Sequence, residues 1–151
     1  MSHKESTKEL EWKRIKDVYS SGDYSLWGKC GISFADPIQG ELGDCWFVAA
    51  ASVAALNPER IKNIFLTEEL NTAGVYALRL YIMGMPVTVT VDDYLPFQKN
   101  TNTLWASRVG PDKSLWMPIL EKASAELYGN YELMEGGAMG PAWSMLTGAP
   151  G

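Results

Sequence analysis

The sequence is poor in histidine and cysteine and has no cluster of basic residues. Its single histidine is His3, and its two cysteines, Cys30 and Cys45, are too few for a disulfide scaffold and lack the spacing of a zinc or redox motif. With a net charge of −5 and no cluster of lysine and arginine interleaved with aromatic residues, the chain lacks the features of a nucleic-acid-binding protein. We therefore expect two reduced thiols and no nucleic-acid partner.

Long hydrophobic stretches are also missing. The N-terminus is charged and lacks the apolar core of a signal peptide, and no run approaches the roughly 18 apolar residues that cross a membrane. These absences predict a cytoplasmic or otherwise intracellular protein without a membrane span. The 151 residues, of which 46% are hydrophobic and 21% charged, are typical of one folded domain.

The first half of the chain predicts an arm, a loop and a buried helix. Residues 1–24 form the arm, where a loose helical spacing of apolar residues ends in the turn-forming stretch Ser20–Asp23. Residues 25–44 are rich in glycine and are expected to be an ordered loop. The stretch CWFVAAASVAAL, from Cys45, is apolar on every face, which predicts a buried helix that ends before Pro58.

The second half predicts a small antiparallel sheet and further helices. Residues 74–82 and 86–97 alternate in apolar character around a Met-Gly-Met turn, which places Val75 and Ala77 on one side with residues 87, 89 and 91. Residues 58–65 predict a short helix, 103–108 a short strand and 115–127 an amphipathic helix closed by Gly129, before a loop-rich tail.

Two acidic residues at the end of the second alternating stretch form a superficial pair. Asp92 and Asp93 follow directly on one another where the strand is expected to end. Aspartate side chains at such positions commonly accept hydrogen bonds from the backbone of a turn. We therefore expect this pair to cap a turn rather than to bind a metal ion.

The stretch QGELGDCW, from Gln39 to Trp46, has the composition of half an active site. A thiol attacks a carbonyl as the thiolate, and the free N–H groups in the first turn of a helix favour negative charge. Cys45 occupies this place, after Gly43 and an expected cap, Asp44. The amide of Gln39 and the N–H of Cys45 are donors suited to an oxyanion. Taken alone, the pattern equally allows a small buried cysteine and an ordinary loop glutamine.

Several motifs resemble those of the calpains, a family of papain-like cysteine proteases. QGELGDCWFVAAAS resembles their active-site segment, and the form QG-LGDCW is that of the calpains in particular. The other matching stretches, in the order of the family, are EWKR, VTVDDYLP, LWMPILEKASAELYGNYELMEGGA and LTGAPG. The resemblance runs from about Glu11 to Gly151.

The resemblance implies an α+β, papain-like fold in which this chain is similar to the first, mostly helical half of a two-part protease core. Cys45 would then be the nucleophile and Gln39 the oxyanion-hole donor. Gly137 would pair through its backbone with an extended substrate, beside Gly136 and Trp46 on the substrate-binding side. The implied activity is that of an intracellular cysteine endopeptidase of the calcium-dependent type, which acts on proteins or peptides.

The family also requires a general-base histidine and an asparagine, which follow the cysteine in the second half of its core. No histidine follows Cys45 here, and His3 is expected to be an exposed terminal residue rather than the base. Residues 25–151 are thus predicted to be the first subdomain only, inactive alone and completed by the second half or by another protein subunit. The alternative is a non-catalytic scaffold or assembly subunit with a calpain fold.

Calcium is the cofactor that the resemblance suggests, and no organic cofactor is expected. The family's ligands fall on the backbone oxygens of Lys29 and Gly31 and on the side chain of Asp36. Ser114 stands where the family has a glutamate, so one strong anionic ligand is missing. Because carboxylates set much of the affinity of such sites, weakened calcium binding is predicted.

Overall fold

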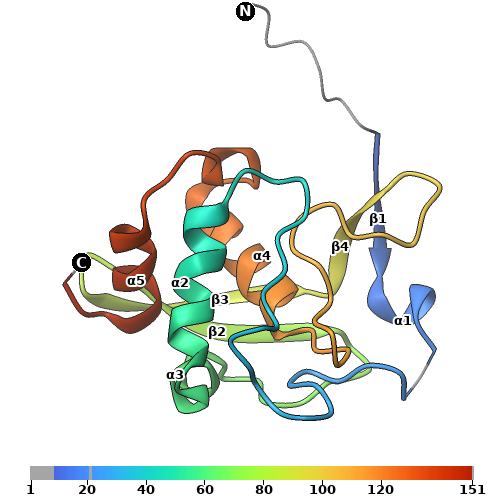
Figure 1. Cartoon of the computed structure of the whole chain (residues 1–151), viewed down its shortest axis with the longest axis horizontal. Coiled ribbons are helices and arrows are strands. Elements are labelled where there is room, and N and C mark those ends of the chain that lie inside the picture. Colours follow the sequence, from blue (N-terminus) through green and yellow to red (C-terminus); the bar gives the residue numbers. More distant parts are fainter. Residues whose placement is uncertain (1–8, 21, 151) are drawn as a thin grey trace, which may run out of the picture.

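The computed structural model describes residues 9–20 and 22–150, so His3 lies outside the described residues. In chain order the elements are β1 (Leu10–Arg14), α1 (Ile15–Val18), α2 (Cys45–Ala55), α3 (Pro58–Ile64), β2 (Val75–Ile82), β3 (Met85–Asp92), β4 (Tyr94–Gln98), α4 (Trp116–Tyr128), the 3-10 helix η1 (Glu132–Met134) and α5 (Met139–Thr147). Helices and small antiparallel sheets together give the α+β class that was predicted (Figure 1).

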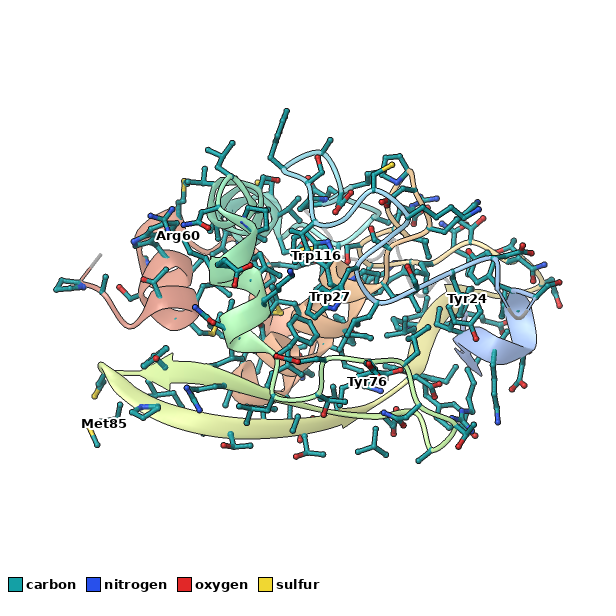
Figure 2. The ribbon with its side chains drawn as sticks, turned by 90° about the horizontal axis from the view of Figure 1, so that it is seen from below. Tyr24, Trp27, Arg60, Tyr76, Met85 and Trp116 are labelled. Carbon is teal, nitrogen blue, oxygen red and sulfur yellow. The ribbon has the colours of Figure 1, made fainter. Side chains whose placement is uncertain are left out.

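Helix α2 stands at the centre of the molecule, between α4 and α5 (Figure 1). The β2–β3 hairpin forms a layer on one side of the helices (Figure 2). Alanine suits a central helix because it favours helix and lets neighbouring elements approach closely. Ala50, Ala51 and Ala54 are completely buried, and α2 packs against α3 and α5.

One strip of α2 is exposed, which corrects the prediction that every face of this helix is buried. Cys45, Ala49 and Val53 follow one another at intervals of four residues, and each is exposed. Leu56, at the C-cap, extends the strip and is 66% exposed. The sequence gives no sign of this strip because its residues are as apolar as those on the buried faces.

The β2–β3 hairpin is confirmed, but Val75 and Ala77 do not share a face with residues 87, 89 and 91, as was predicted. Strands β2 and β3 pair in antiparallel register around a turn at Met83 and Gly84, both with positive φ. The side toward the core carries three cross-strand pairs, Tyr76 with Val91, Leu78 with Val89 and Leu80 with Val87. Residues directly opposite each other share a face, so Val75 and Ala77 lie on the outer side with Asp92 and Thr90.

The second predicted strand divides in two, and the arm contributes a partner. The strand is interrupted at Asp93. After this residue β4 pairs with β1, which lies in the arm that was expected to be partly helical. Only the single turn of α1 fulfils the helical expectation for the arm. The Arg14 guanidinium binds both oxygens of Asp93, at 2.7 and 3.2 Å, so this ion pair fixes the branch point.

Two further predictions for the C-terminal part need correction. Residues 103–108 form no strand, although Leu104 makes an isolated bridge with Phe97. The tail, expected to be loop, contains η1 and the nine-residue helix α5. Gly140 and Pro141 lie in the first turn of α5, where proline is tolerated. Because glycine and proline are more common in loops, the sequence of α5 does not have the appearance of a helix. The predicted helices over 58–65 and 115–127 are confirmed, with Gly129 at the C-cap of α4.

Candidate active site

Cys45 is the first residue of α2, and its side chain is exposed. The backbone N–H groups of Phe47 and Val48 both donate to the carbonyl of Asp44, at 2.8 and 3.1 Å, and so begin the helix. Trp46, Phe47 and Val48 are buried directly behind the thiol, which fixes the first turn against the core. Cys30 is also exposed, and both cysteines are free, as the sequence predicts.

The loop before Cys45 is fixed by short backbone contacts with residues from the second half of the chain. Glu41 donates its N–H to the carbonyl of Trp105 at 2.8 Å, and Gly43 accepts from the N–H of Gly136 at 3.2 Å. Gly40 packs so closely that a Cβ at this position would lie 1.8 Å from the carbonyl oxygen of Ala106. Only glycine fits at this position, so the path of the loop is tightly defined.

The side-chain amide of Gln39 lies within this same loop. Its Nε2 donates to the carbonyl of Leu42 at 2.7 Å, which uses one of the two N–H donors of the amide. Leu42 itself is completely buried, so its carbonyl is a fixed anchor. Gln39 is exposed, and its second N–H has no hydrogen-bond partner among the described residues. One donor of an ordered amide therefore remains for a ligand.

Trp46 connects the nucleophile helix to the glycines near the C-terminus of the chain. Its indole N–H donates to the carbonyl of Met134 at 2.7 Å, and its ring lies against Gly137. A Cβ on Gly137 would lie 2.3 Å from Cε2 of the indole. With only 7% of Trp46 exposed, we expect it to position Gly137 rather than to contact a substrate broadly. Gly136 and Gly137 are both exposed.

Asp44 does not cap α2 with its side chain, contrary to the expectation from the sequence. The residue is 1% exposed, and its carboxyl group lies beside that of Glu121 from α4. Glu121 accepts hydrogen bonds from the N–H and hydroxyl of Ser107, at 2.8 and 2.9 Å. The residue directly before Cys45 in the sequence therefore belongs to a buried pair of carboxyl groups.

Burial changes the protonation of this pair. It raises the pKa of Glu121 well above the ordinary range, and the neighbouring Asp44 raises this pKa further. Burial also raises the pKa of Asp44, which its interaction with the Glu121 carboxyl group partly offsets, and no backbone or hydroxyl group of the described residues donates a hydrogen bond to either Asp44 oxygen. Tyr131, whose hydroxyl is buried beside them, has a pKa raised by its own burial and then by the charges of Glu121 and Asp44. The pair is best satisfied when one proton is shared between the two carboxyl groups.

Glu121, Ser107 and Tyr131 were not identified from the sequence. The one available signal was a glutamate at a position of α4 surrounded by apolar residues, in the stretch MPILEKA. Charged residues are almost never fully buried unless a partner satisfies them. Such a glutamate could therefore have been expected to have a buried partner, although not which one.

The residues suggested for calcium lie in a different loop. Asp36 is 3% exposed, and one of its oxygens accepts from the indole N–H of Trp116 and the N–H of Ser33, both at 2.8 Å. Burial raises the pKa of Asp36, with a smaller contribution from the charge of Asp112. Gly31 lies nearby in the chain with φ of 80°, a conformation that favours glycine.

Asp112, from the segment before α4, contacts this loop and is a carboxylate that the sequence did not indicate. It accepts from the N–H of Cys30 at 3.2 Å, while its other oxygen is buried without a partner, as is the hydroxyl of Ser114. The described part of the chain contains no group of three or more carboxylate, histidine or cysteine side chains able to hold a metal ion. Two carboxylates and one hydroxyl are fewer charged donors than the oxygen-rich sites that bind calcium tightly.

An exposed thiol at the start of a buried helix, preceded by an ordered amide donor, is the arrangement of enzymes that form covalent acyl intermediates on cysteine. The fold and this site define a papain-like cysteine protease core.

Comparison with known proteins gives the family. The model of the calpain family of cysteine proteases matches residues 1–151, and the chain belongs to this family. A calpain-type cysteine protease of Zea mays is 38% identical over 145 residues. Calpain-12 of Mus musculus is 35% identical over 150 residues, and the calpain-2 catalytic subunit of Mus musculus is 32% identical over 145 residues.

These matches cover most of this chain but a small part of each relative. They span 93%, 97% and 94% of this chain, and 7% of the maize protein and 20% of each mouse protein. Within residues 9–20 and 22–150, none of the helices has the length and apolar character that a membrane crossing requires.

Proposed function

We propose that this chain is the nucleophile-bearing part of an intracellular cysteine endopeptidase, which acts on extended segments of proteins. Cys45 attacks the scissile carbonyl, and the free N–H of Gln39 together with the backbone N–H of Cys45 stabilises the oxyanion. The observation that carries this proposal is the exposed Cys45 thiol at the first turn of a helix whose other faces are buried. Such a thiol is accessible and rigidly held.

The reaction needs a general base that these 151 residues do not contain. Their only histidine is His3, ahead of Cys45, so the base is proposed to come from residues outside this sequence, in a longer chain or in another subunit. In the proposed sequence of steps, the Cys45 sulfur forms a thioester with the acyl group and the C–N bond breaks. The base first takes the thiol proton and later gives it to the leaving amine, and water then hydrolyses the thioester.

The exposed strip of α2 supports a partner at this face. Val53 and Leu56 are 38% and 66% exposed, in line with Cys45 along the helix, and Phe34 and Ile38 are 61% and 38% exposed in the loop before it. Several exposed apolar side chains on the helix that carries the reactive residue, and on the loop before it, are typical of a surface that another domain covers. We propose that this surface receives the part of the protein that carries the base.

Gly136 and Gly137 are proposed to bind the substrate through their backbone. Both are exposed, and Gly137 has no side chain that could block an extended peptide. The Trp46 ring lies against Gly137. This contact fixes the position of the Gly137 backbone relative to the helix that carries the nucleophile. Glycine allows close approach of a second backbone, so this segment is suited to pair with residues next to the scissile bond.

Thiol alkylation tests the nucleophile. In a Cys30→Ser background, iodoacetamide should modify Cys45 near neutral pH faster than it modifies Cys30 in the matched Cys45→Ser variant. Both thiols are exposed, so accessibility alone does not separate them. Equal rates for the two single-cysteine variants would contradict the proposed activation and would favour a non-catalytic scaffold.

Complementation tests the missing base. A fluorogenic peptide should not be cleaved by this chain alone. Cleavage should appear when the chain is mixed with the segment of the calpain-2 catalytic subunit that follows its region of similarity to this chain, and Cys45→Ala should abolish it. Cys45-dependent turnover by the chain alone would contradict the need for an outside base. A mixture that forms a stable complex without any cleavage would contradict the enzymatic proposal.

We also propose that the loop near Asp36 binds calcium only weakly. Asp36 and Asp112 would hold the ion, with the Ser114 hydroxyl and the backbone oxygens of Lys29 and Gly31 as neutral donors. The ion would neutralise the two carboxylates and hold the loop. The buried, unpaired oxygen of Asp112 and hydroxyl of Ser114 support this assignment, while the small number of charges supports the low affinity.

A further inference from the structure

A cavity of about 380 Å³ lies between α3, α5 and β2 and has no part in the site around Cys45. Arg60 reaches it from α3 and Arg79 from β2, and no aspartate or glutamate is among its lining residues. Figure 2 shows Arg60 where α3 meets α5, on the side of the molecule away from Tyr24 and the arm. The cavity is thus lined by two cations and no anion.

Neither arginine has a carboxylate partner among the described residues. The guanidinium of Arg60 lies over the ring of Trp143, 5.5 Å from its centroid, and makes no ion pair. Arg79 stands opposite Thr88 in the hairpin, also without an ion pair in the described part of the chain. In a chain with a net charge of −5, acidic groups are plentiful, so two arginines left unpaired at one cavity are notable.

The remaining walls of the cavity combine the polar residues Asn63 and Thr147 with apolar and aromatic ones. Ile64 and Leu146 line it and are each 3% exposed. Tyr81 packs against the C-cap of α5, where a Cβ on Gly148 would lie 2.9 Å from the tyrosine ring. A cavity that combines apolar side chains with a few polar groups is the usual form of a binding site, and the exposed Arg60 and Arg79 are accessible to a charged ligand there.

We propose that this cavity is a binding site for an acidic segment of a polypeptide, in which a carboxylate side chain lies beside an apolar residue. The carboxylate binds Arg60 and Arg79, and the apolar neighbour contacts the partly exposed rings of Tyr81 and Trp143. Arginine suits this role because its planar guanidinium binds a carboxylate through two parallel hydrogen bonds. The occupant is a peptide rather than a free anion, because an apolar side chain beside the carboxylate would also cover these partly exposed rings.

The position of the cavity makes it a docking site separate from the cleavage site. Cys45 begins α2, whereas Arg60 lies in α3, which follows the opposite end of α2 (Figure 1). The length of α2 separates the two regions by about 15 Å, at 1.5 Å per residue. An extended peptide covers this distance with roughly five residues. Binding at the cavity does not depend on catalysis by Cys45, so the two proposals are tested separately.

Binding is measured by NMR on the full ¹⁵N-labelled chain, through the indole N–H signal of Trp143, assigned with Trp143→Phe. The probe is the peptide acetyl-Ala-Leu-Glu-Leu-Ala-amide, compared with the same peptide containing Gln in place of Glu. The Glu peptide should shift this signal with a dissociation constant of about 1 mM or lower. The Gln peptide should bind at least about tenfold more weakly, because it lacks the charge.

Variants of the chain give the matched comparison. Arg79→Gln and Arg60→Gln should each weaken binding of the Glu peptide about tenfold or more, and higher salt should weaken it further. Lys62→Gln removes the same charge from α3 but lies outside the cavity, so it should leave binding unchanged. Equal affinity for the two peptides, equal effects of Arg79→Gln and Lys62→Gln, or no shift at 10 mM peptide (about ten times the expected constant) would each overturn the proposal.

Discussion

Trp46 donates its indole N–H to the carbonyl of Met134 at 2.7 Å, across 88 residues of sequence. This bond connects the residue after the nucleophile to the turn that precedes Gly136 and Gly137. The Trp46 ring then lies against Gly137, so the helix that carries the thiol and the segment proposed to bind substrate share one fixed contact. The geometry of the candidate site therefore depends on packing behind the exposed surface as much as on the exposed residues.

The contact between Trp46 and Gly137 predicts the effect of a single methyl group. Gly137→Ala would place a Cβ 2.3 Å from the indole, which the fixed ring has little room to avoid. We expect a loss of about 1–3 kcal/mol in the free energy of unfolding, measured with urea. Gly43→Ala is the control, because its Cβ would meet only Glu135, at 3.7 Å. Similar losses for both variants would contradict this account of the packing.

The carboxyl pair under the thiol predicts how stability depends on pH. Burial, and then Asp44, raise the pKa of Glu121 in the folded state, so the folded protein keeps a proton that the unfolded chain releases. The resulting contribution to stability is present in acid and is lost as the pH rises above about 4.5 toward the folded pKa. We expect the free energy of unfolding to fall over this range.

Glu121→Gln should reduce this fall. The amide oxygen can still accept from Ser107, and the amide N–H can donate to Asp44 without any proton to lose. Unfolding by urea between pH 5 and 8, the span in which most proteins are most stable, measures the effect. Glu126→Gln, an exposed change on the same helix, should leave the pH dependence unaltered. If the free energy of unfolding of Glu121→Gln depended on pH as in the unmodified chain, the Asp44–Glu121 pair would not be the cause of this dependence.

The ion pair between Arg14 and Asp93 predicts that the arm depends on one carboxylate. Asp93→Asn removes the charge and one of two parallel hydrogen bonds at the point where β3 ends and β4 begins. We expect a lower urea midpoint and faster proteolysis within β1. Asp92→Asn is the comparison, because Asp92 is exposed and pairs with Lys122, and it should have the smaller effect. The reverse order would contradict the anchoring role of Asp93.

The loop around Asp36 predicts weak calcium binding. Calorimetric titration should give a dissociation constant of about 10⁻⁴ M or weaker, since only two carboxylates are available. Asp112→Asn and Asp36→Asn should each remove the remaining binding, whereas Asp23→Asn, in an exposed turn, should not. A micromolar affinity of the unmodified chain for calcium would show that Ser114, in place of a glutamate, does not weaken the site. If Asp36→Asn abolished calcium binding and Asp112→Asn did not, Asp112 would not be a ligand of the ion.

Local sequence signals predicted several elements correctly. The apolar run from Cys45, the proline that follows it and the spacing of residues 115–127 fixed the helices α2, α3 and α4, because helix formation depends on residues three or four apart. The same signals failed where glycine and proline obscured helix α5, and where a period of two did not reveal which residues of β2 share a face with residues 87, 89 and 91. That grouping depends on the register between the two strands, and a shift of one residue moves every side chain to the other face.

By itself, the sequence determined the family, the α+β class, and the place of Cys45 at the start of a helix after the Gln39 loop, because these features depend on residues close together along the chain. Only the tertiary structure decided the exposed strip on α2, the pairing of Asp44 with Glu121, the anchoring of Arg14 by Asp93 and the two unpaired arginines around one cavity. These depend on residues that are distant in sequence, 79 apart for Arg14 and Asp93, and on burial that only the packed chain defines.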